Sequence, residues 1–464
     1  MSHQDQDGRK IGCQVQFLQQ ALRWLLRKNA LAEIGFREDC TWTPLQFVAA
    51  ALLWAWSDEA TLIDRFHTAR KIVEHLNAPQ HELAGSYQAF LKMLVRWTAR
   101  LVVLLQIALR ERMQQTLPGR WRQHGFVLFG VDGSRIELPR TKSNELAYAQ
   151  KKKKLKRKTK RRSKQSAAAR ARKAHTPQMW LTTVWHAGTG LPWDWRIGPA
   201  DSSEREHWRE MLSQLPLEAL MAVDAGFVGY DYVKDVLDGG RHLLLRVGSN
   251  VRLLNKLGRT RERDGIVYLW PNRAAEQGLP PLKLRLVIAH NGKHPMYLVT
   301  SVLAVERLSD KDVIQLYRQR WGIELFYRHF KQTFQRRKLR SENAANARVE
   351  LEWSLLGLWA MALYAEVQLA RDDIPAAKMS IAGVLRAFRR TMRDYLHPVE
   401  RHNLCAQLRR AIIDSYHRQN KASRSYPRKK QETPPGAPRI IPASLAQRQL
   451  AQSLPQREQK RLTA

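Results

Sequence analysis

The sequence contains little cysteine, and what it has is scattered. Cys13, Cys40 and Cys405 are the three cysteines of the 464-residue chain. An odd number of widely separated thiols does not make a disulfide framework, and it lacks the close thiolate spacing of a structural zinc site. This usage fits a reducing compartment, and we expect a cytoplasmic protein.

Long apolar runs are also missing. The longest, Leu355 to Ala365, is shorter than a membrane span, and Glu352 and Glu366 bracket it. The chain begins MSHQDQD, which lacks the charged and then apolar pattern of a signal peptide. No lipid-facing amphipathic helix accompanies the basic segments, so we expect no membrane partner.

Acidic residues are scarce relative to basic ones. The chain has 79 Lys and Arg against 42 Asp and Glu, a formal net charge of +37. Residues 151–173 hold 14 of the basic residues and no acid, and residues 418–464 hold 11 against two acids. The rest of the chain is also net positive, which indicates a polyanionic partner. We expect that partner to be nucleic acid.

The N-terminal quarter is predicted to be helical. Four segments have apolar residues at three- and four-residue spacing, separated by polar or Pro/Gly breaks: Gln16–Lys28, Pro44–Trp56, Leu62–Leu76 and Tyr87–Gln115. We expect residues 1–118 to form a helical domain. Such helices are either a packed bundle or, beside a DNA-processing core, a reader of DNA ends.

A mixed α/β region follows residue 118. Its predicted strands and hairpin lie at 126–131, 180–187, 191–197 and 219–223, and a helix with Ser203 and Glu206 as a capping box precedes the last of these. Four more strands are expected at 243–247, 267–270, 282–288 and 296–301. The region 119–345 is therefore predicted to be an α/β domain. Helices at 350–370 and 380–396 should follow within 346–417, and a disordered basic tail within 418–464.

Two aspartates are placed where the chain leaves an apolar strand. Asp132 follows Phe126–Val131, and Asp224 follows Ala219–Val223. Carboxylates at strand ends are displayed at the edge of a sheet, where a helix carboxylate can approach them. A single Asp-Gly after a strand is more often a turn, so neither aspartate identifies a site by itself.

A third acid belongs to a patterned helix. A helix predicted from Ser309 to about Arg337 carries Tyr317, Arg320, Glu324 and Lys331 at offsets 0, 3, 7 and 14. At about 100° per residue, these four side chains fall within a stripe ~60° wide. Such a stripe could hold a metal ion and bind phosphates. The plainer alternative is a solvated face with ion pairs along the helix.

Three ordered motifs resemble one family. The Tyr-x2-Arg-x3-Glu-x6-Lys spacing of the stripe resembles the signature of bacterial insertion-sequence DDE transposases. Val131–Pro139 resembles the block around the first acid of that family, and Val223–Phe227 the block around the second. The similarity covers roughly residues 120 to 370.

The resemblance implies a fold and a site. The fold is a ribonuclease H-like core with a β-rich insertion at about 240–305, and the metal ligands are Asp132, Asp224 and Glu324. A two-metal Mg²⁺ site is implied, with Mn²⁺ as a substitute, acting on double-stranded DNA at the element's ends and at the target. Tyr317, Arg320 and Lys331 would contact DNA phosphates. The protein would act as a homodimer in the DNA complex, in association with the bacterial nucleoid.

Several alternatives stay open at this point. Trp321 either stacks on an unpaired base or is a core aromatic. The basic run 151–173 either binds flanking DNA non-specifically or is an electrostatic tether. The expected function is cut-and-paste transposition. The rivals are a catalytically silent transposase-derived DNA-binding protein and a stand-alone metal-dependent nuclease.

Overall fold

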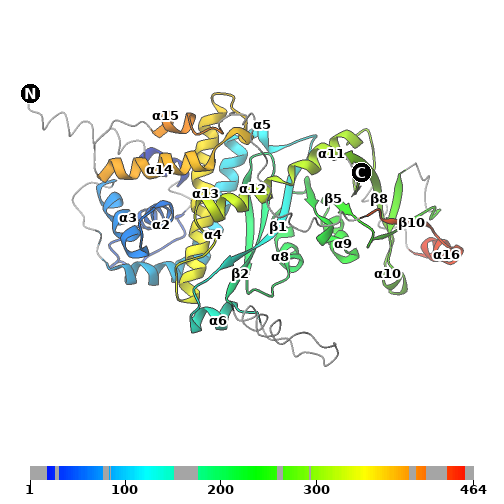
Figure 1. The fold of residues 1–464 in the computed structure, drawn as a ribbon, viewed down its shortest axis with the longest axis horizontal. Helices are drawn as coiled ribbons and strands as arrows, with labels where there is room; N and C mark the ends of the chain where they lie inside the picture. The colour runs from blue at the N-terminus through cyan, green and yellow to red at the C-terminus, as the bar shows by residue number, and fades with distance from the viewer. Residues whose placement is uncertain are drawn as a thin grey trace, which may run out of the picture.

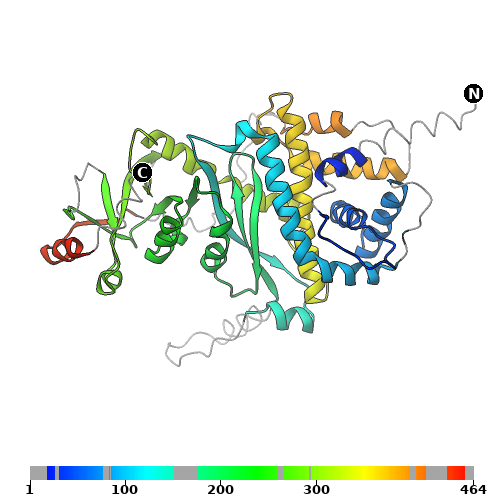
Figure 2. The same cartoon turned by 180° about the vertical axis from the view of Figure 1, so that it is seen from behind.

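The computed structural model describes residues 18–26, 31–76, 83, 85–150, 176–258, 265–291, 294–396, 404–413 and 436–454. Within them the chain forms a helical bundle at one end and a long sheet that extends away from it (Figures 1 and 2). The long helices α4 (Tyr87–Thr116) and α13 (Ala344–Ala370) lie side by side between the bundle and the first strands of the sheet (Figure 2). These two helices therefore connect the bundle and the sheet.

The predicted N-terminal helices are confirmed where the structure describes them. Residues 18–25 are helical, and three labelled helices follow: α2 (Pro44–Trp56), α3 (Leu62–Leu76) and α4 (Tyr87–Thr116). Thr43 caps α2 in a capping box with Gln46, and Pro44 occupies the first turn, where its missing N–H costs nothing. Nearly every residue of α2 is buried, so this helix is the centre of the bundle.

The C-terminal helices complete the same bundle. They are α13 (Ala344–Ala370), α14 (Ile381–Leu396) and α15 (Leu404–Arg409). The indole of Trp56 in α2 donates to the Gly357 carbonyl of α13 at 2.8 Å. A Cβ at Gly357 would lie 3.1 Å from that of Ala55, so the glycine allows the two helices to approach closely. The N-terminal and C-terminal helical regions, predicted as separate stretches of sequence, share one core.

Ten strands form a single sheet in the order β10-β6-β7-β8-β9-β5-β4-β1-β2-β3. Their bounds are β1 Val127–Glu137, β2 Gln178–His186, β3 Leu191–Gly198, β4 Ala219–Val223, β5 His242–Val247, β6 Arg252–Asn255, β7 Ile266–Leu269, β8 Leu282–Asn291, β9 His294–Thr300 and β10 Arg439–Pro442. Strands β1, β2 and β3 are antiparallel neighbours, whereas β4 and β5 run parallel to β1. This arrangement is the ribonuclease H-like core that the family resemblance implied.

The expected β-rich insertion is an extension of the core sheet. Strand β5 belongs to the core because it pairs with β4, and β9 pairs with its other edge. Strands β8, β7 and β6 continue outward from β9. The sequence patterns found the later strands but not β6, which is only four residues long.

The expectation of a disordered tail over 418–464 is wrong for residues 436–454. Strand β10 adds in parallel to the outer edge of β6, and α16 (Leu445–Ser453) follows it. Ser444 and Gln447 form a capping box at the start of α16. The composition is polar, but Ile440 and Ile441 supply strand residues that cover an otherwise unpaired sheet edge. The rest of the predicted tail, 418–435 and 455–464, lies outside the described residues.

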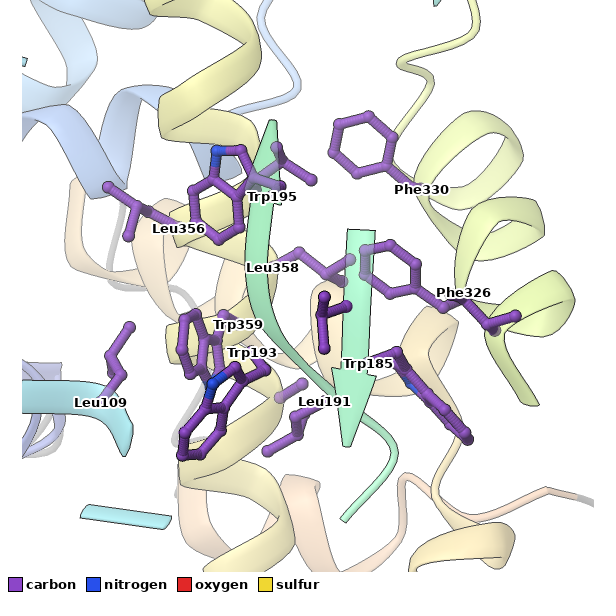
Figure 3. Packing of buried hydrophobic residues seen from close by; sticks show 14 of the residues in the cluster. Leu109, Trp185, Leu191, Trp193, Trp195, Phe326, Phe330, Leu356, Leu358 and Trp359 are labelled. Atoms are coloured by element: carbon purple, nitrogen blue, oxygen red, sulfur yellow. The ribbon is translucent and has the colours of Figure 1, made fainter. Parts of the chain in front are cut away.

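The remaining helices lie on the sheet or connect its strands. They are α5 (Pro118–Trp121), α6 (Lys142–Tyr148), α8 (Glu204–Met211), α9 (Tyr230–Asp238), α10 (Asn272–Glu276), α11 (Asp310–Gln319) and α12 (Gly322–Arg328). Around the β2–β3 hairpin, tryptophans from the strands pack between α13 on one side and α12 on the other (Figure 3). Trp195 and Trp359 meet edge to face, with ring centroids 6.2 Å apart. This contact holds α13 against strand β3 of the core sheet.

Candidate active site

Asp132 and Asp224 lie level with each other on neighbouring strands. The parallel pairing of β1 and β4 ends with Gly130 opposite Ala222, two residues before each aspartate. Asp224 follows the fully buried β4 and caps a short 3₁₀ turn by accepting from the Gly226 N–H at 2.8 Å. The two carboxylates therefore stand where the strands separate.

The expectation that Asp132 ends its strand is wrong. Strand β1 continues to Glu137, with Asp132 opposite Thr183 of β2. The Asp-Gly-Ser sequence indicated a turn, but Gly133 is enclosed instead. A Cβ there would lie 2.6 Å from Oε1 of Glu204 and 2.8 Å from the Trp180 ring. Close packing from both sides holds this stretch extended, so Asp132 projects from the middle of a strand.

Glu324 is carried by α12, but the predicted continuous helix from Ser309 to Arg337 is wrong. Ser309 caps α11 as expected, and the chain then forms α11, α12 and a π-helical turn at His329–Thr333. Between the helices, the N–H groups of Arg320 and Glu324 donate to carbonyls three residues earlier, each at 3.1 Å. The helix is thus tightened before Glu324 and widened after it.

A long-range contact explains the break. A Cβ at Gly322 would lie 2.0 Å from the Trp185 ring of β2, so only glycine fits at the start of α12. The hydroxyl of Tyr327 donates to the backbone carbonyl of Asp132 at 2.7 Å. These two contacts hold α12 against β1 and β2, and they bring Glu324 towards Asp132.

Arg320 lies between the acids and Tyr317. Its guanidinium Nη2 is 3.3 Å from Oε1 of Glu324, and it lies over the Tyr317 ring at 5.8 Å from the centroid. The Tyr317 hydroxyl is buried, and burial raises its pKa. The ion pair of the plainer alternative is therefore present, but it lies among the predicted site residues.

Lys331 and Trp321 lie at the margins of the site. Lys331 is half-buried, which lowers its pKa, whereas the nearby Glu137 and Asp132 act in the opposite direction. Trp321 is 58% exposed, so it is not a core aromatic. Its indole lines a pocket of about 630 Å³ together with Trp185 and Arg318.

The acids influence one another electrostatically. The pKa of Asp132 is raised to about 6, mainly by burial; the charges of Asp224 and Glu324 also raise it, while Arg320 lowers it. Mutual repulsion of this kind requires that the three carboxylates be near one another. The structure therefore places three acids that are 92 and 100 residues apart in sequence close enough for their charges to act on Asp132.

A fourth acid, Glu204, was missed as a site residue. Burial, and after it the neighbouring charges of Asp132 and Asp224, raise its pKa to about 7. Sequence reasoning found the helix that begins here, and the Ser203 cap is confirmed. It assigned Glu206 to a capping box with Ser203, whereas the Glu206 side chain contacts Tyr232 and Arg209 instead, and it gave Glu204 no role. A signal was nevertheless present, because this helix follows the β2–β3 hairpin and must cross back over β1 to reach β4.

Oxygen ligands for a metal ion are available at this site. Carboxylates are the ligand type that Mg²⁺ and Mn²⁺ prefer, and the Glu204 carboxyl group, which lies next to Asp132 and the Gly133 N–H, forms no ion pair with a described residue. Within the described ranges, no three Asp, Glu, His or Cys side chains are already gathered around one ion position. The donor chemistry fits a divalent cation, and binding would draw the carboxylates closer together.

Comparisons with known proteins bear on the same residues. Residues 124–360 match the family described as "Transposase DDE domain". The chain is 26% identical over 256 residues to the transposase InsG for insertion sequence element IS4 of Escherichia coli K12, which covers 53% of each chain. It is 23% identical over 168 residues to a putative transposase for element IS4SA of Synechocystis, covering 35% of this chain and 46% of that one. The chain thus spans about half the length of the curated relatives it matches.

One solved structure is also similar. A cryo-EM structure of a piggyBac transposase synaptic complex with hairpin DNA has a TM-score of 0.37 and 12% identity, and covers 90% of this chain and 86% of that one. In the part of the chain that the structure describes, no helix is both long and apolar enough to cross a membrane.

Proposed function

Because the chain belongs to the DDE transposase family, we propose that it is a transposase that moves an insertion sequence by metal-dependent strand cleavage and strand transfer. The observation that supports this most is the placement of Asp132 and Asp224 at the divergence of β1 and β4, with Glu324 held beside them by α12. Family membership alone would also fit an inactive relative. All three acids and their mutual proximity favour an enzyme.

Asp132, Asp224 and Glu324 would hold the divalent cation, which we propose to be Mg²⁺, with Mn²⁺ as a substitute. When bound at a pair of positions, such ions activate water and stabilise the charge of a phosphoryl displacement. The Asp132 carboxyl group must be ionised to serve as a ligand, and its raised pKa makes this favourable above about pH 6. Glu324 must release part of its interaction with Arg320 to do so.

Cationic and aromatic side chains around the acids would bind DNA. Arg320 is already next to Glu324, so releasing it would free a guanidinium for a phosphate at the cleaved end. Lys331 lies on the side of Asp132, and we propose that it contacts a second phosphate. The exposed Trp321 is available for stacking on an unpaired base.

The proposed partners are the ends of the element and a double-stranded target, bound by two copies of the chain. The strong positive charge favours such a polyanion, and an enzyme of this kind would act at the nucleoid. The described part of the N-terminal helical region is a candidate for binding the DNA ends.

The test uses purified protein, Mg²⁺ and DNA that carries the two ends of the element, taken from the sequence flanking the gene. We expect nicking at the ends and joining to a target plasmid. Asp132→Ala, Asp224→Ala and Glu324→Ala should each abolish nicking while DNA binding persists, because these acids repel phosphates when no cation lies between them. Cleavage without joining would indicate a nuclease. Binding without cleavage by the unaltered protein would indicate a silent DNA-binding protein.

A further inference from the structure

The first turn of α8 brings a fourth carboxylate to the acids of the site. Glu204 is the first residue of α8, directly after the capping Ser203. Its Oε1 atom is so close to β1 that a Cβ on Gly133 would lie only 2.6 Å away. Gly133 adjoins Asp132, so the glycine is what allows the Glu204 side chain to reach the strand beside the first acid.

Nothing positive accompanies this carboxylate. In the described part of the chain Glu204 forms no ion pair. Its carboxyl group interacts with the carboxyl group of Asp132 and the N–H of Gly133, and its buried Oε1 atom has no other hydrogen-bond partner. The charges that act on it are those of Asp132 and Asp224, which are negative as well. Burying an unpaired carboxylate among other acids costs folding free energy, and such costs are typical of functional sites.

The next residue holds α8 in this position. Nε of Arg205 donates to the carbonyl of Gly226 at 2.7 Å, and its guanidinium lies over the Tyr232 ring at 5.1 Å. Gly226 belongs to the turn that Asp224 caps. Arg205 therefore ties the start of α8 to the loop of the second acid rather than neutralising Glu204.

We propose that Glu204 is a fourth carboxylate ligand of the divalent cation held by Asp132 and Asp224. The proposal rests on the proposed function, because it assigns a further residue to the same metal centre. A cation would give the buried Oε1 atom a partner of opposite charge, and it would neutralise Glu204 together with Asp132 and Asp224, whose charges act on it. Helix α8 would then both connect β3 to β4 and carry a ligand of the metal ion.

The experiment measures Mn²⁺ binding to the DNA-free protein by isothermal titration and by the loss of the free-Mn²⁺ signal in electron paramagnetic resonance. Glu204→Gln keeps the shape of the side chain and removes its charge. Changes to the groups that support metal ligands typically weaken binding by about 10–100-fold, so loss of a direct ligand should weaken it by at least about tenfold.

Two variants serve as references. Glu206→Gln alters an acid of the same helical turn that is exposed and interacts with Tyr232 and Arg209, and its Mn²⁺ affinity should match the unaltered protein. Asp132→Asn should lose Mn²⁺ binding.

Thermal unfolding measured without metal shows whether Glu204 is a metal ligand or a group that stabilises the fold. Glu204→Gln should unfold at the same or a higher temperature, since it removes repulsion, and Mn²⁺ should raise that temperature less than in the unaltered protein.

Unchanged Mn²⁺ affinity in Glu204→Gln would overturn the inference. Failure of this variant to fold, or a much lower unfolding temperature, would also overturn it, because the Glu204 carboxylate would then be needed for the structure. If the unaltered protein binds Mn²⁺ but this variant binds it equally well, only the fourth ligand is wrong. If the unaltered protein binds no Mn²⁺, the metal requirement of the proposed function fails instead.

Discussion

At the scale of single residues, replacing Arg320 tests whether its contact with Glu324 belongs to a catalytic site or is only a structural ion pair. Its contact with Glu324 is an i,i+4 pair in which Arg320 is 13% exposed and Glu324 36%. Pairs of this kind contribute about 0.5 kcal/mol to stability, whereas a cation positioned at a reacting phosphate contributes ~3–4 kcal/mol to the transition state. Arg320→Ala should therefore slow end cleavage by about 10²–10³-fold and change the unfolding free energy by less than about 1 kcal/mol.

The control for Arg320 is Arg328→Ala, an exposed arginine at the end of α12. Cleavage rates and thermal unfolding are measured on the same preparations. Near-normal cleavage by a folded Arg320→Ala protein would assign the arginine to a purely structural pair.

The burial of His186 predicts how the stability of the fold depends on pH. It is fully buried, its Nε2–H donates to the Trp121 carbonyl at 3.2 Å, and Nδ1 accepts from the Thr189 N–H at 3.2 Å. Burial lowers its pKa from 6.5 to about 4. The unfolded chain then binds a proton that the folded protein does not, so stability is lost as the pH falls from about 6.5 to about 4, by roughly 3 kcal/mol at most.

The measurement is denaturant unfolding between pH 4 and pH 8. His186→Gln should be less stable at pH 8, because it loses the ring packing against Trp121, but its stability should fall less on acidification. The same acid dependence in the variant would show that other groups dominate this pH range.

At the scale of elements, the contact between Gly322 and Trp185 should control the position of the catalytic glutamate. Gly322→Ala places a methyl group 2.0 Å from an atom of the Trp185 ring, which is large and cannot move freely. Overpacking of this kind lowers the free energy of unfolding by about 1–3 kcal/mol. Displacement of α12 should also reduce cleavage, because Glu324 lies in its first turn. Replacing Trp185 with leucine in the same chain should recover part of both losses.

Gly35→Ala is the matched control, since nothing lies within 4 Å of the added atom. It should leave stability and cleavage unchanged. If Gly322→Ala is as harmless as Gly35→Ala, then the helix start is not fixed by the tryptophan.

These contacts also show what the sequence could and could not predict. Pro44–Trp56 and Leu62–Leu76 were placed at the bounds of α2 and α3, because apolar periodicity and the polar or Pro/Gly breaks between helices are local signals. The break at Gly322 depends on a ring from a strand that is more than a hundred residues earlier. The extension of β1 beyond Asp132 and the proximity of Glu204 depend on packing around Gly133 in the same way. Local patterns do not encode such contacts, so the triad was found through the order of its motifs and the fourth acid was not found.

At the scale of the whole molecule, the charge distribution predicts how DNA affinity depends on salt. Residues 151–173 lie outside the described residues, but their 14 Lys and Arg without an acid make a phosphate-binding segment that carries no base readout. Replacing them with a neutral Gly/Ser linker of equal length should weaken binding to all DNA sequences alike. For every phosphate that the protein no longer neutralises, the slope of log affinity against log salt should flatten by about 0.9. End cleavage at saturating protein should persist, because Asp132, Asp224 and Glu324 belong to the described core.

A second variant separates charge from sequence in this segment. Shuffling the order of residues 151–173 keeps all 14 cations, so both affinity and salt slope should match the unaltered protein if the segment acts only through its charge. Binding is measured with DNA of unrelated sequence and with the element's ends, each over a range of salt concentrations. An unchanged slope in the neutral-linker protein would mean that the segment does not touch DNA. A loss confined to the element's ends would mean that it reads sequence, and its role in the molecule would then be recognition rather than electrostatic attraction.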